Sequence, residues 1–251
     1  MRLLQLELRS QLRLYWRSRE LAFFTFALPL IMFFLLGSVY GDDKIKAEGN
    51  IRAADYLLAG MLGYGAIATG FAGLSIMMVI RRESGILKRV RATPLPPWVY
   101  VVALLGTTLV AFGLEAVCMV AIGRFHFHTH THNLGSLALA LLLSAAAFTA
   151  LGLALTVLIK SAEGSSAVVN AIYLPLAFLS GAFFSPHSFP AVLKAIANAL
   201  PLVYVIRLVR DIAIHNQHIW DRPGDVAVIA AWGLAGAIFA ARRFRWEPQE
   251  G

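Results

Sequence analysis

The segment that decides the fold is RRESGILKRVRATPLPP, residues 81–97, a charged stretch between two long apolar runs. Residues 81–91 carry five Lys or Arg and one Glu, and we expect them to form about three helical turns. Pro94, Pro96 and Pro97 then prevent the helix from continuing. In a chain that otherwise lies in lipid, such a segment is where a water-soluble protein can act on the membrane domain.

The rest of the chain is too apolar for a soluble domain. Of its 251 residues, 59% are hydrophobic and 14% charged, and the mean hydropathy is +0.69. A helix needs roughly 20 apolar residues to cross a bilayer. Five runs meet or approach that length: 21–40, 56–80, 98–123, 134–159 and 165–184. A sixth run, 226–241, is shorter, so we expect Arg242 and Arg243 to snorkel at its end or the bilayer to thin there. We therefore predict an all-α polytopic membrane protein with six transmembrane helices in one domain, residues 21–245.

Positive charges predict the orientation of these spans, because Lys and Arg in short loops stay on the cytoplasmic side. Fourteen of the 22 Lys and Arg residues fall before the first span, in residues 81–91, at Lys160 or after the last span, all on one side of a six-span chain. The other eight are largely offset by seven Asp and Glu residues. Both termini are therefore predicted to be cytoplasmic. We attribute the net charge of +8 to this topology and to contact with anionic lipids, and not to nucleic-acid binding.

Residues 1–20 are expected to form a cytoplasmic amphipathic helix. Arg2, Arg9, Arg13 and Arg17 share one arc of such a helix, and three aliphatic side chains and one aromatic one share the opposite side: Leu4, Leu8, Leu12 and Tyr15. This pattern is typical of a helix lying in the membrane interface. A basic flank that only sets the orientation is the alternative interpretation.

Residues 185–215 are interpreted as an outer re-entrant hairpin between the fifth and sixth spans. We expect the chain to enter it through Ser185-Pro186 and to turn near Pro201. A seventh span here would place Lys194 and Arg207 near hydrocarbon and move the basic C-terminal residues to the outside. Irregular backbone at that depth requires shielding by protein or a water-filled cavity.

Two segments carry a resemblance to a known family. Residues 83–95, ESGILKRVRATPL, resemble the charged loop between the second and third spans of the membrane subunits of type-2 ABC transporters. Residues 179–186, LSGAFFSP, with residues 200–211, are similar to the outer hairpin before the last span of that family. The family includes daunorubicin-resistance-like, nodulation-factor and polysaccharide exporters. The resemblance covers nearly the whole chain and implies a permease of the bacterial or archaeal cytoplasmic membrane that exports an amphiphilic drug, lipid or lipid-linked glycan.

The resemblance also implies the partners. Energy would come from a separate ABC ATPase subunit in two copies, which binds ATP and Mg²⁺, while this chain is no enzyme and binds no cofactor. The sequence agrees, because a Walker A loop contains Gly-Lys followed by Ser or Thr, and no Gly-Lys pair occurs here. In the family a second permease subunit, identical or different, completes the pathway, with the second and fifth spans facing the route.

We hypothesise that residues 1–20 and 81–97 seat on the ATPase, so that its closure on ATP moves the first and second spans. In this hypothesis Ile86, Leu87 and Val90 form an apolar contact face. Around it lie the other coupling candidates: Arg82, Lys88, Arg89, Arg91, the local partner Glu83, the bend at Gly85, and Pro94. A purely basic topology signal is the alternative.

Polar residues within the predicted spans are candidates for the substrate pathway. They are Asn170, Tyr173 and Ser180 in the fifth span and Glu115 in the third, the only charged residue inside a predicted span. Counted from Trp98, Glu115 falls nearer the outer interface than the midplane, so a shielded structural role is the alternative. The second span is rich in glycine, which permits close helix packing between two subunits or within one: Gly60, Gly63, Gly65, Gly70 and Gly73.

Four histidines alternate along an outer loop: His126, His128, His130 and His132. Extended backbone would point all four to one side, but neighbours roughly 7 Å apart cannot share one metal ion unless the loop curls. We therefore favour a solvated loop over a metal site. All seven histidines are predicted on the outer side, which argues against an intramembrane serine protease. An ion-gradient-driven secondary transporter is the alternative function, although such proteins usually show midplane charges or an inverted repeat.

Overall fold

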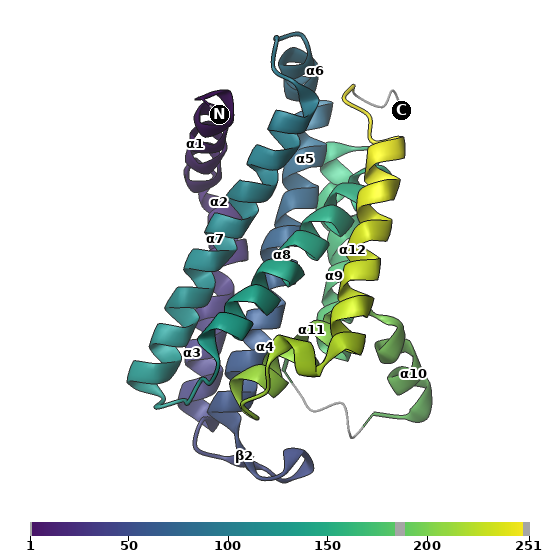
Figure 1. The fold of residues 1–251 in the computed structure, drawn as a ribbon. Coiled ribbons are helices and arrows are strands. Elements are labelled where there is room, and N and C mark those ends of the chain that lie inside the picture. The colour runs from purple at the N-terminus through teal and green to yellow at the C-terminus, as the bar shows by residue number, and fades with distance from the viewer. Residues whose placement is uncertain (1, 184–188, 248–251) are drawn as a thin grey trace.

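Helices make up nearly all of the fold (Figure 1), and the computed structural model describes residues 2–183 and 189–247. In chain order the α-helices are α1 (Arg2–Arg17), α2 (Arg19–Ala22), α3 (Leu28–Tyr40), α4 (Ala53–Ile67), α5 (Leu74–Glu83), α6 (Ile86–Arg91), α7 (Pro97–His126), α8 (Leu134–Thr156), α9 (Ala162–Leu179), α10 (Ala191–Ala199), α11 (Pro201–Ala213) and α12 (Pro223–Arg243). Two π-helical segments, η1 (Phe23–Ala27) and η3 (Ala68–Gly73), continue into α3 and α5, and η2 (Lys46–Glu48) and η5 (Ile219–Asp221) are short 3₁₀ turns. Strands β1 (Lys44–Ile45) and β2 (Ile51–Arg52) pair antiparallel.

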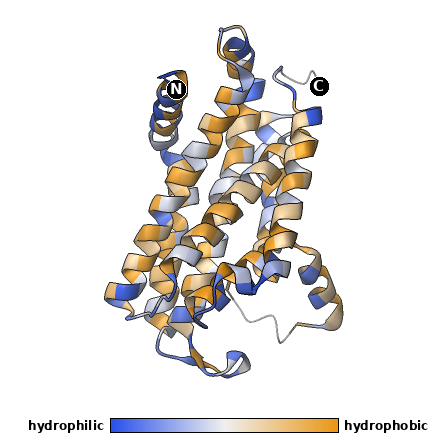
Figure 2. Ribbon diagram, viewed as in Figure 1, coloured by the Kyte–Doolittle hydropathy of each residue, from blue (hydrophilic) through white to orange (hydrophobic). Residues whose placement is uncertain are grey.

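Within the described residues, six helical units are long and apolar enough to cross a membrane: Arg19–Tyr40, Ala53–Glu83, Pro97–His126, Leu134–Thr156, Ala162–Leu179 and Pro223–Arg243. Apolar residues run along these units over most of their length (Figure 2). The predicted all-α polytopic membrane protein is thereby confirmed. The helix of the sixth span is longer than the apolar run 226–241, because α12 begins at Pro223 and includes Arg242 and Arg243, giving 21 residues.

The bundle has two different ends (Figure 1). The N-terminal part of α1, the short helix α6 and the C-terminal end of α12 lie at one end, which we call the termini end. The β-hairpin, α10, α11 and the connection between α7 and α8 lie at the other, which we call the hairpin end. An even number of spans requires this arrangement, because each span carries the chain from one end to the other.

The second span, formed by α4, η3 and α5, is the centre of the bundle. Almost every residue of α4 and η3 is buried, and α3, α7, α8, α9 and α11 pack around this span. A Cβ at Gly60 would meet the carbonyl of Ala182, and one at Gly63 would meet the Ile206 side chain. Gly65, Gly70 and Gly73 likewise face neighbours of the same subunit. Of the two interpretations of these glycines, the structure supports packing within one subunit.

The segment before the last span is a helix pair bent by 86° at Leu200. Pro201 is the first residue of α11, where its missing N–H costs nothing. Most of α11 is buried against α4, α8 and α12, whereas α10 is largely exposed. The turn predicted near Pro201 is therefore present, and the predicted entry at Ser185-Pro186 lies outside the described residues.

Charges at the hairpin end are paired with one another. Arginines form four ion pairs among the described residues there: Arg222–Asp211 at 2.9 Å, Arg52–Asp42 at 3.1 Å, Arg207–Asp225 at 3.5 Å and Arg210–Glu48 at 3.8 Å. Arg210 also lies 3.9 Å above the centre of the Tyr56 ring. This end consequently presents much less uncompensated positive charge than the termini end.

Close packing of α8 against the second span predicts that Gly152→Ala is destabilising. A Cβ at Gly152 would lie 2.6 Å from the Gly70 carbonyl oxygen and 3.1 Å from the Phe71 Cα. We expect the free energy of unfolding to fall by about 1–3 kcal/mol, measured by thermal melting in mild detergent. The matched control is Gly113→Ala in α7, where a Cβ meets nothing within 4 Å, and where the change is neutral or stabilises by up to about 1 kcal/mol. Equal melting temperatures for the two variants would contradict this packing.

Candidate functional site

A short helix projects from the termini end of the bundle (Figure 1). Helix α5 ends at Glu83, the chain turns at Ser84-Gly85, and α6 begins at Ile86. Gly85 has a φ of +73°, in the left-handed region that favours glycine. The predicted continuous helix over residues 81–91 is therefore wrong, because a left-handed residue interrupts the α-helix at Gly85.

Arg82 lies beneath this turn and is buried. Its Nη1 donates to the Thr156 carbonyl at 2.8 Å, its Nη2 to the Ile159 carbonyl at 2.5 Å, and its Nε to Glu83 Oε1 at 2.7 Å. Carbonyls at the C-terminal end of a helix have no partner within the helix, and Arg82 supplies one for α8. The placement of Arg82 around an exposed contact face is thus corrected, since its guanidinium fastens α5 to α8 inside the subunit.

Leu87 also points into the subunit, and its assignment to an exposed face is corrected for the same reason. It is fully buried in a cluster with Leu74, Met78, Tyr100 and Leu104. The opposite side of α6 is open: Ile86, Lys88, Arg89, Arg91 and the following Pro94 are exposed, and Val90 is half-buried. We call these five exposed residues the α6 surface.

Helix α1 is tied to the same region. Its inner face includes Gln11 and Tyr15, which are buried, whereas Arg9, Arg13 and Arg17 are exposed. Arg81 donates from Nη1 to Gln11 Oε1 and to the Tyr100 hydroxyl, the latter at 3.1 Å. Sequence reasoning missed Arg81 as a structural residue, because a basic side chain at the end of a span is normally expected in water.

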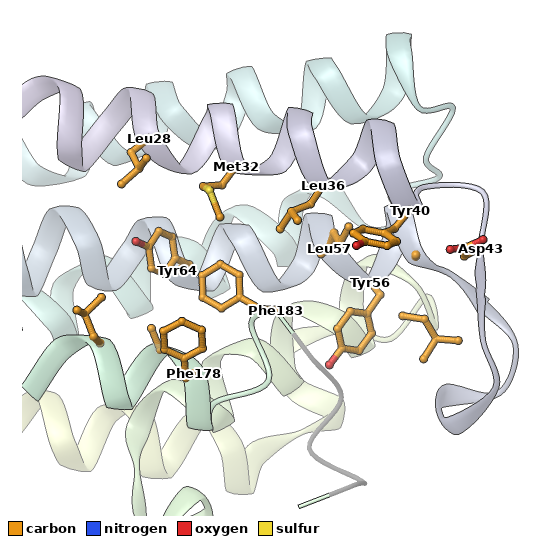
Figure 3. A pocket seen from close by; sticks show the side chains of 14 residues that line it. Leu28, Met32, Leu36, Tyr40, Asp43, Tyr56, Leu57, Tyr64, Phe178 and Phe183 are labelled. Atoms are coloured by element: carbon orange, nitrogen blue, oxygen red, sulfur yellow. The ribbon is translucent and has the colours of Figure 1, made fainter.

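A cavity of about 590 Å³ lies between α3, α4 and α9 (Figure 3). Every fourth residue of α3 lines one wall: Leu28, Met32, Leu36 and Tyr40. Tyr56 and Tyr64 contribute from α4, Phe178 from α9, and Phe183 from the segment after α9. Asp43 lies at the hairpin end of this cavity, beyond Tyr40. The lining is apolar except for tyrosine hydroxyls and one carboxylate, which suits an elongated amphiphilic molecule.

The three candidates of the predicted fifth span are separated from this cavity. Tyr173 is buried behind Tyr64, with 5.5 Å between the ring centroids. Ser180 is buried and donates to the Ala177 carbonyl at 2.7 Å, while Asn170 donates to Ser166 on the same helix at 3.3 Å. None of the three is among the cavity-lining residues. Sequence reasoning looked for polar side chains, whereas the cavity is lined mainly by aromatic and aliphatic ones.

Glu115 is fully buried and joins a chain of polar contacts. The Thr69 hydroxyl lies 3.2 Å from Glu115 Oε2 and 3.1 Å from the Thr25 carbonyl. The Thr25 hydroxyl in turn lies 2.7 Å from the Tyr15 hydroxyl. Burial raises the pKa of Tyr15 to about 12, so this hydroxyl keeps its proton at neutral pH. The contacts connect α1, η1, η3 and α7, and they favour the shielded structural role for Glu115 over a place in the cavity wall.

Both π-helical segments of the bundle meet at this chain of contacts. Thr25 lies in η1 and Thr69 in η3, and the two segments pack against each other. π-helical turns are rare and are frequently found at functional sites. Their position in the first and second spans places two irregular turns side by side within the bundle.

The four histidines of the loop do not converge. His126 ends α7 and stacks on Phe34 with 5.1 Å between ring centroids, and His128 has a φ of +53°. The backbone is therefore not extended at His128. Among the described residues, no group of three or more His, Cys, Asp or Glu side chains is placed to hold a metal ion.

The contacts of Glu115 predict that an amide replaces its carboxyl group well. Thr69 has one hydroxyl proton for two oxygen neighbours, so a group at position 115 that donates to Thr69 would satisfy both contacts. We expect Glu115→Gln to melt within a few degrees of the unchanged protein, and Glu115→Ala to lose about 2 kcal/mol or more because it leaves a cavity. Thermal melting in detergent distinguishes them. A Gln variant as unstable as the Ala variant would show that the contacts require a carboxylate.

Comparison with known proteins gives the family. A search of curated protein sequences found no match. A family model described as ABC-2 type transporter matches residues 2–214, which include α1, the first five spans, the α6 surface and the bent helix pair. From this match and the six candidate spans, the chain belongs to the ABC-2 type transporter family and is a membrane permease component.

Proposed function

We propose that this chain is the permease subunit of an ATP-driven exporter, which moves an amphiphilic substrate out of the cytoplasm or the inner leaflet. Membership of the ABC-2 family implies partnership with an ABC ATPase subunit. We propose that two copies of that ATPase bind ATP and Mg²⁺ and supply the energy, and that the chain itself binds no cofactor. Efflux of a drug, a lipid or a lipid-linked glycan is consistent with this role.

The observation that carries the proposal is the rigid attachment of an exposed helix to the second span. The α6 surface is open to a partner, while Leu87 and Arg82 hold α6 and α5 onto α7 and α8. A force applied to α6 therefore reaches the central span and α8 together. This attachment supports coupling between a docked ATPase and the membrane helices.

The orientation follows from charge. The termini end carries the exposed cations of α1 and α6, whereas those of the hairpin end are largely paired. The positive-inside rule therefore favours a cytoplasmic position for the termini end, where an ATPase would be found. We propose a cytoplasmic-membrane location with both termini inside.

The cavity between α3, α4 and α9 supports an amphiphilic substrate. Helices α3 and α9 also carry exposed apolar side chains, among them Leu35, Phe34 and Ile172. We propose that a second permease subunit, identical or different, covers part of this apolar surface and completes the pathway. The alternative of an ion-gradient-driven transporter is not favoured by the family match.

The proposal is tested by purifying the tagged chain from its native membranes in mild detergent and assaying the eluate for ATPase activity. We expect an ATPase to co-purify, and ATP to drive accumulation of a fluorescent amphiphile when the complex is placed in vesicles. A well-folded preparation without ATPase activity, whose vesicles transport along an ion gradient instead, would establish the secondary-transporter alternative.

Charge reversal on the α6 surface predicts loss of the partner without loss of the fold. Arg89→Glu places an acid on an exposed position, so we expect at least about tenfold weaker association with the ATPase and an unchanged melting temperature. The control is Arg124→Glu, an exposed residue at the other end of α7, which should leave association unchanged. If Arg89→Glu associates normally with the ATPase, α6 is not part of the interface.

For Arg82 we predict the opposite: its replacement destabilises the fold, and does not act by removing a contact with the ATPase. Arg82→Met removes the donor to two buried carbonyls and one side of the contact with Glu83, so we expect a loss of about 3–5 kcal/mol in the free energy of unfolding. Thermal melting measures this loss against the exposed control Arg89→Met. A stable Arg82→Met protein that no longer associates with the ATPase would show that Arg82 belongs to the docking surface.

A further inference from the structure

The segment after the last span packs against the corner between α6 and α7. Helix α12 ends at Arg243, and the chain then continues at the termini end beyond α12 (Figure 1). Phe244 and Trp246 pack on the buried cluster that contains Leu87 and Tyr100. These residues lie outside the part of the chain that the family model matches.

Trp246 is held by aromatic contacts. Its ring packs edge-to-face with the Tyr100 ring, at 5.6 Å between centroids, and with the Phe244 ring, at 5.5 Å. Such edge-to-face pairs each contribute about 0.5–1.5 kcal/mol beyond their buried area. Tyr100 also receives the hydrogen bond from Arg81. The segment is thereby joined to α5, α7 and α12 through two aromatic rings.

Trp246 forms one wall of a hollow of about 280 Å³. The remaining walls come from the end of α6 and the proline-rich turn that follows: Val90, Arg91, Thr93, Pro94, Leu95, Pro96 and Pro97. Small-molecule sites usually enclose about 300–1,000 Å³. A smaller hollow with rigid proline and tryptophan walls suits one large apolar side chain of another protein.

Positive charge is concentrated on the elements next to this hollow. Six exposed cations belong to α6, the last turn of α12 and the segment after it: Lys88, Arg89, Arg91, Arg242, Arg243 and Arg245. Glu247 forms an exposed ion pair with Arg91 at 3.6 Å. The excess of cations favours a partner surface that is acidic around its apolar side chain.

We propose that residues 244–247 complete the docking surface for the ATPase subunit. Trp246 and the prolines receive one large apolar side chain of the ATPase, and the six cations face acidic residues around that side chain. The inference rests on the proposed function and adds a second contact, continuous with the α6 surface, that leads directly into the sixth span. The ATPase would thus act on the second and sixth spans at once.

Two variants test the role of residues 244–247. The probe is the ATPase subunit, which is first purified through its association with the unchanged chain. Trp246→Ala should weaken its binding about tenfold or more, as is common for a tryptophan at the centre of an interface. Arg245→Glu should weaken binding more strongly at low salt than at high salt, because added salt screens exposed charges. The controls are Trp220→Ala and Arg124→Glu, exposed residues outside the termini end.

Each outcome separates this inference from the proposed function. If Trp246→Ala and Arg245→Glu bind normally while Arg89→Glu does not, docking on α6 stands and the role of residues 244–247 is overturned. Normal binding of all three variants overturns the whole docking surface. If Trp246→Ala fails to fold in a melting assay, Arg245→Glu decides, because that side chain is exposed.

Discussion

The structure depends on the close approach of every neighbour to the second span. In lipid the hydrophobic effect does not drive helices together, so association relies on van der Waals contact and on satisfied polar groups. Glycines along α4 and η3 bring backbone against backbone or side chain on several sides. The helices that form the cavity, hold Glu115 and support α6 are positioned by this one span.

The termini end shows how a surface element becomes mechanically part of a bundle. Arg82 supplies hydrogen-bond donors to α8, Arg81 joins α1 to α7 through Gln11 and Tyr100, and Leu87 fills the space beneath α6. Each of these contacts satisfies a polar group or buries an apolar one, so their stabilisation does not depend on a partner. The outer side of α6, the segment after α12 and the exposed arginines of α1 are left for recognition.

The fold could be predicted from the sequence to a large extent, because uncharged runs of span length and the distribution of cations are local signals. The bend near Pro201 followed from proline chemistry. Arg82 and Leu87 were placed wrongly because helical spacing does not say which side of a short helix faces a neighbour, and the break at Gly85 changes that side. The cavity between α3, α4 and α9 could not be predicted, since apolar residues that line a cavity have the same pattern as those that face lipid.

The paired segments η1 and η3 have a consequence for motion. A π-helical turn accommodates one residue more than an α-helical turn, and the extra residue can be passed along the helix. A stretch of helix over which it passes rotates by about 100° and advances by about 1.5 Å, while the helix beyond stays in phase. Such a shift in the first or second span changes which of its own side chains face the cavity and leaves the helix unbroken. The two π-helical segments that allow it meet where Thr69 contacts Thr25.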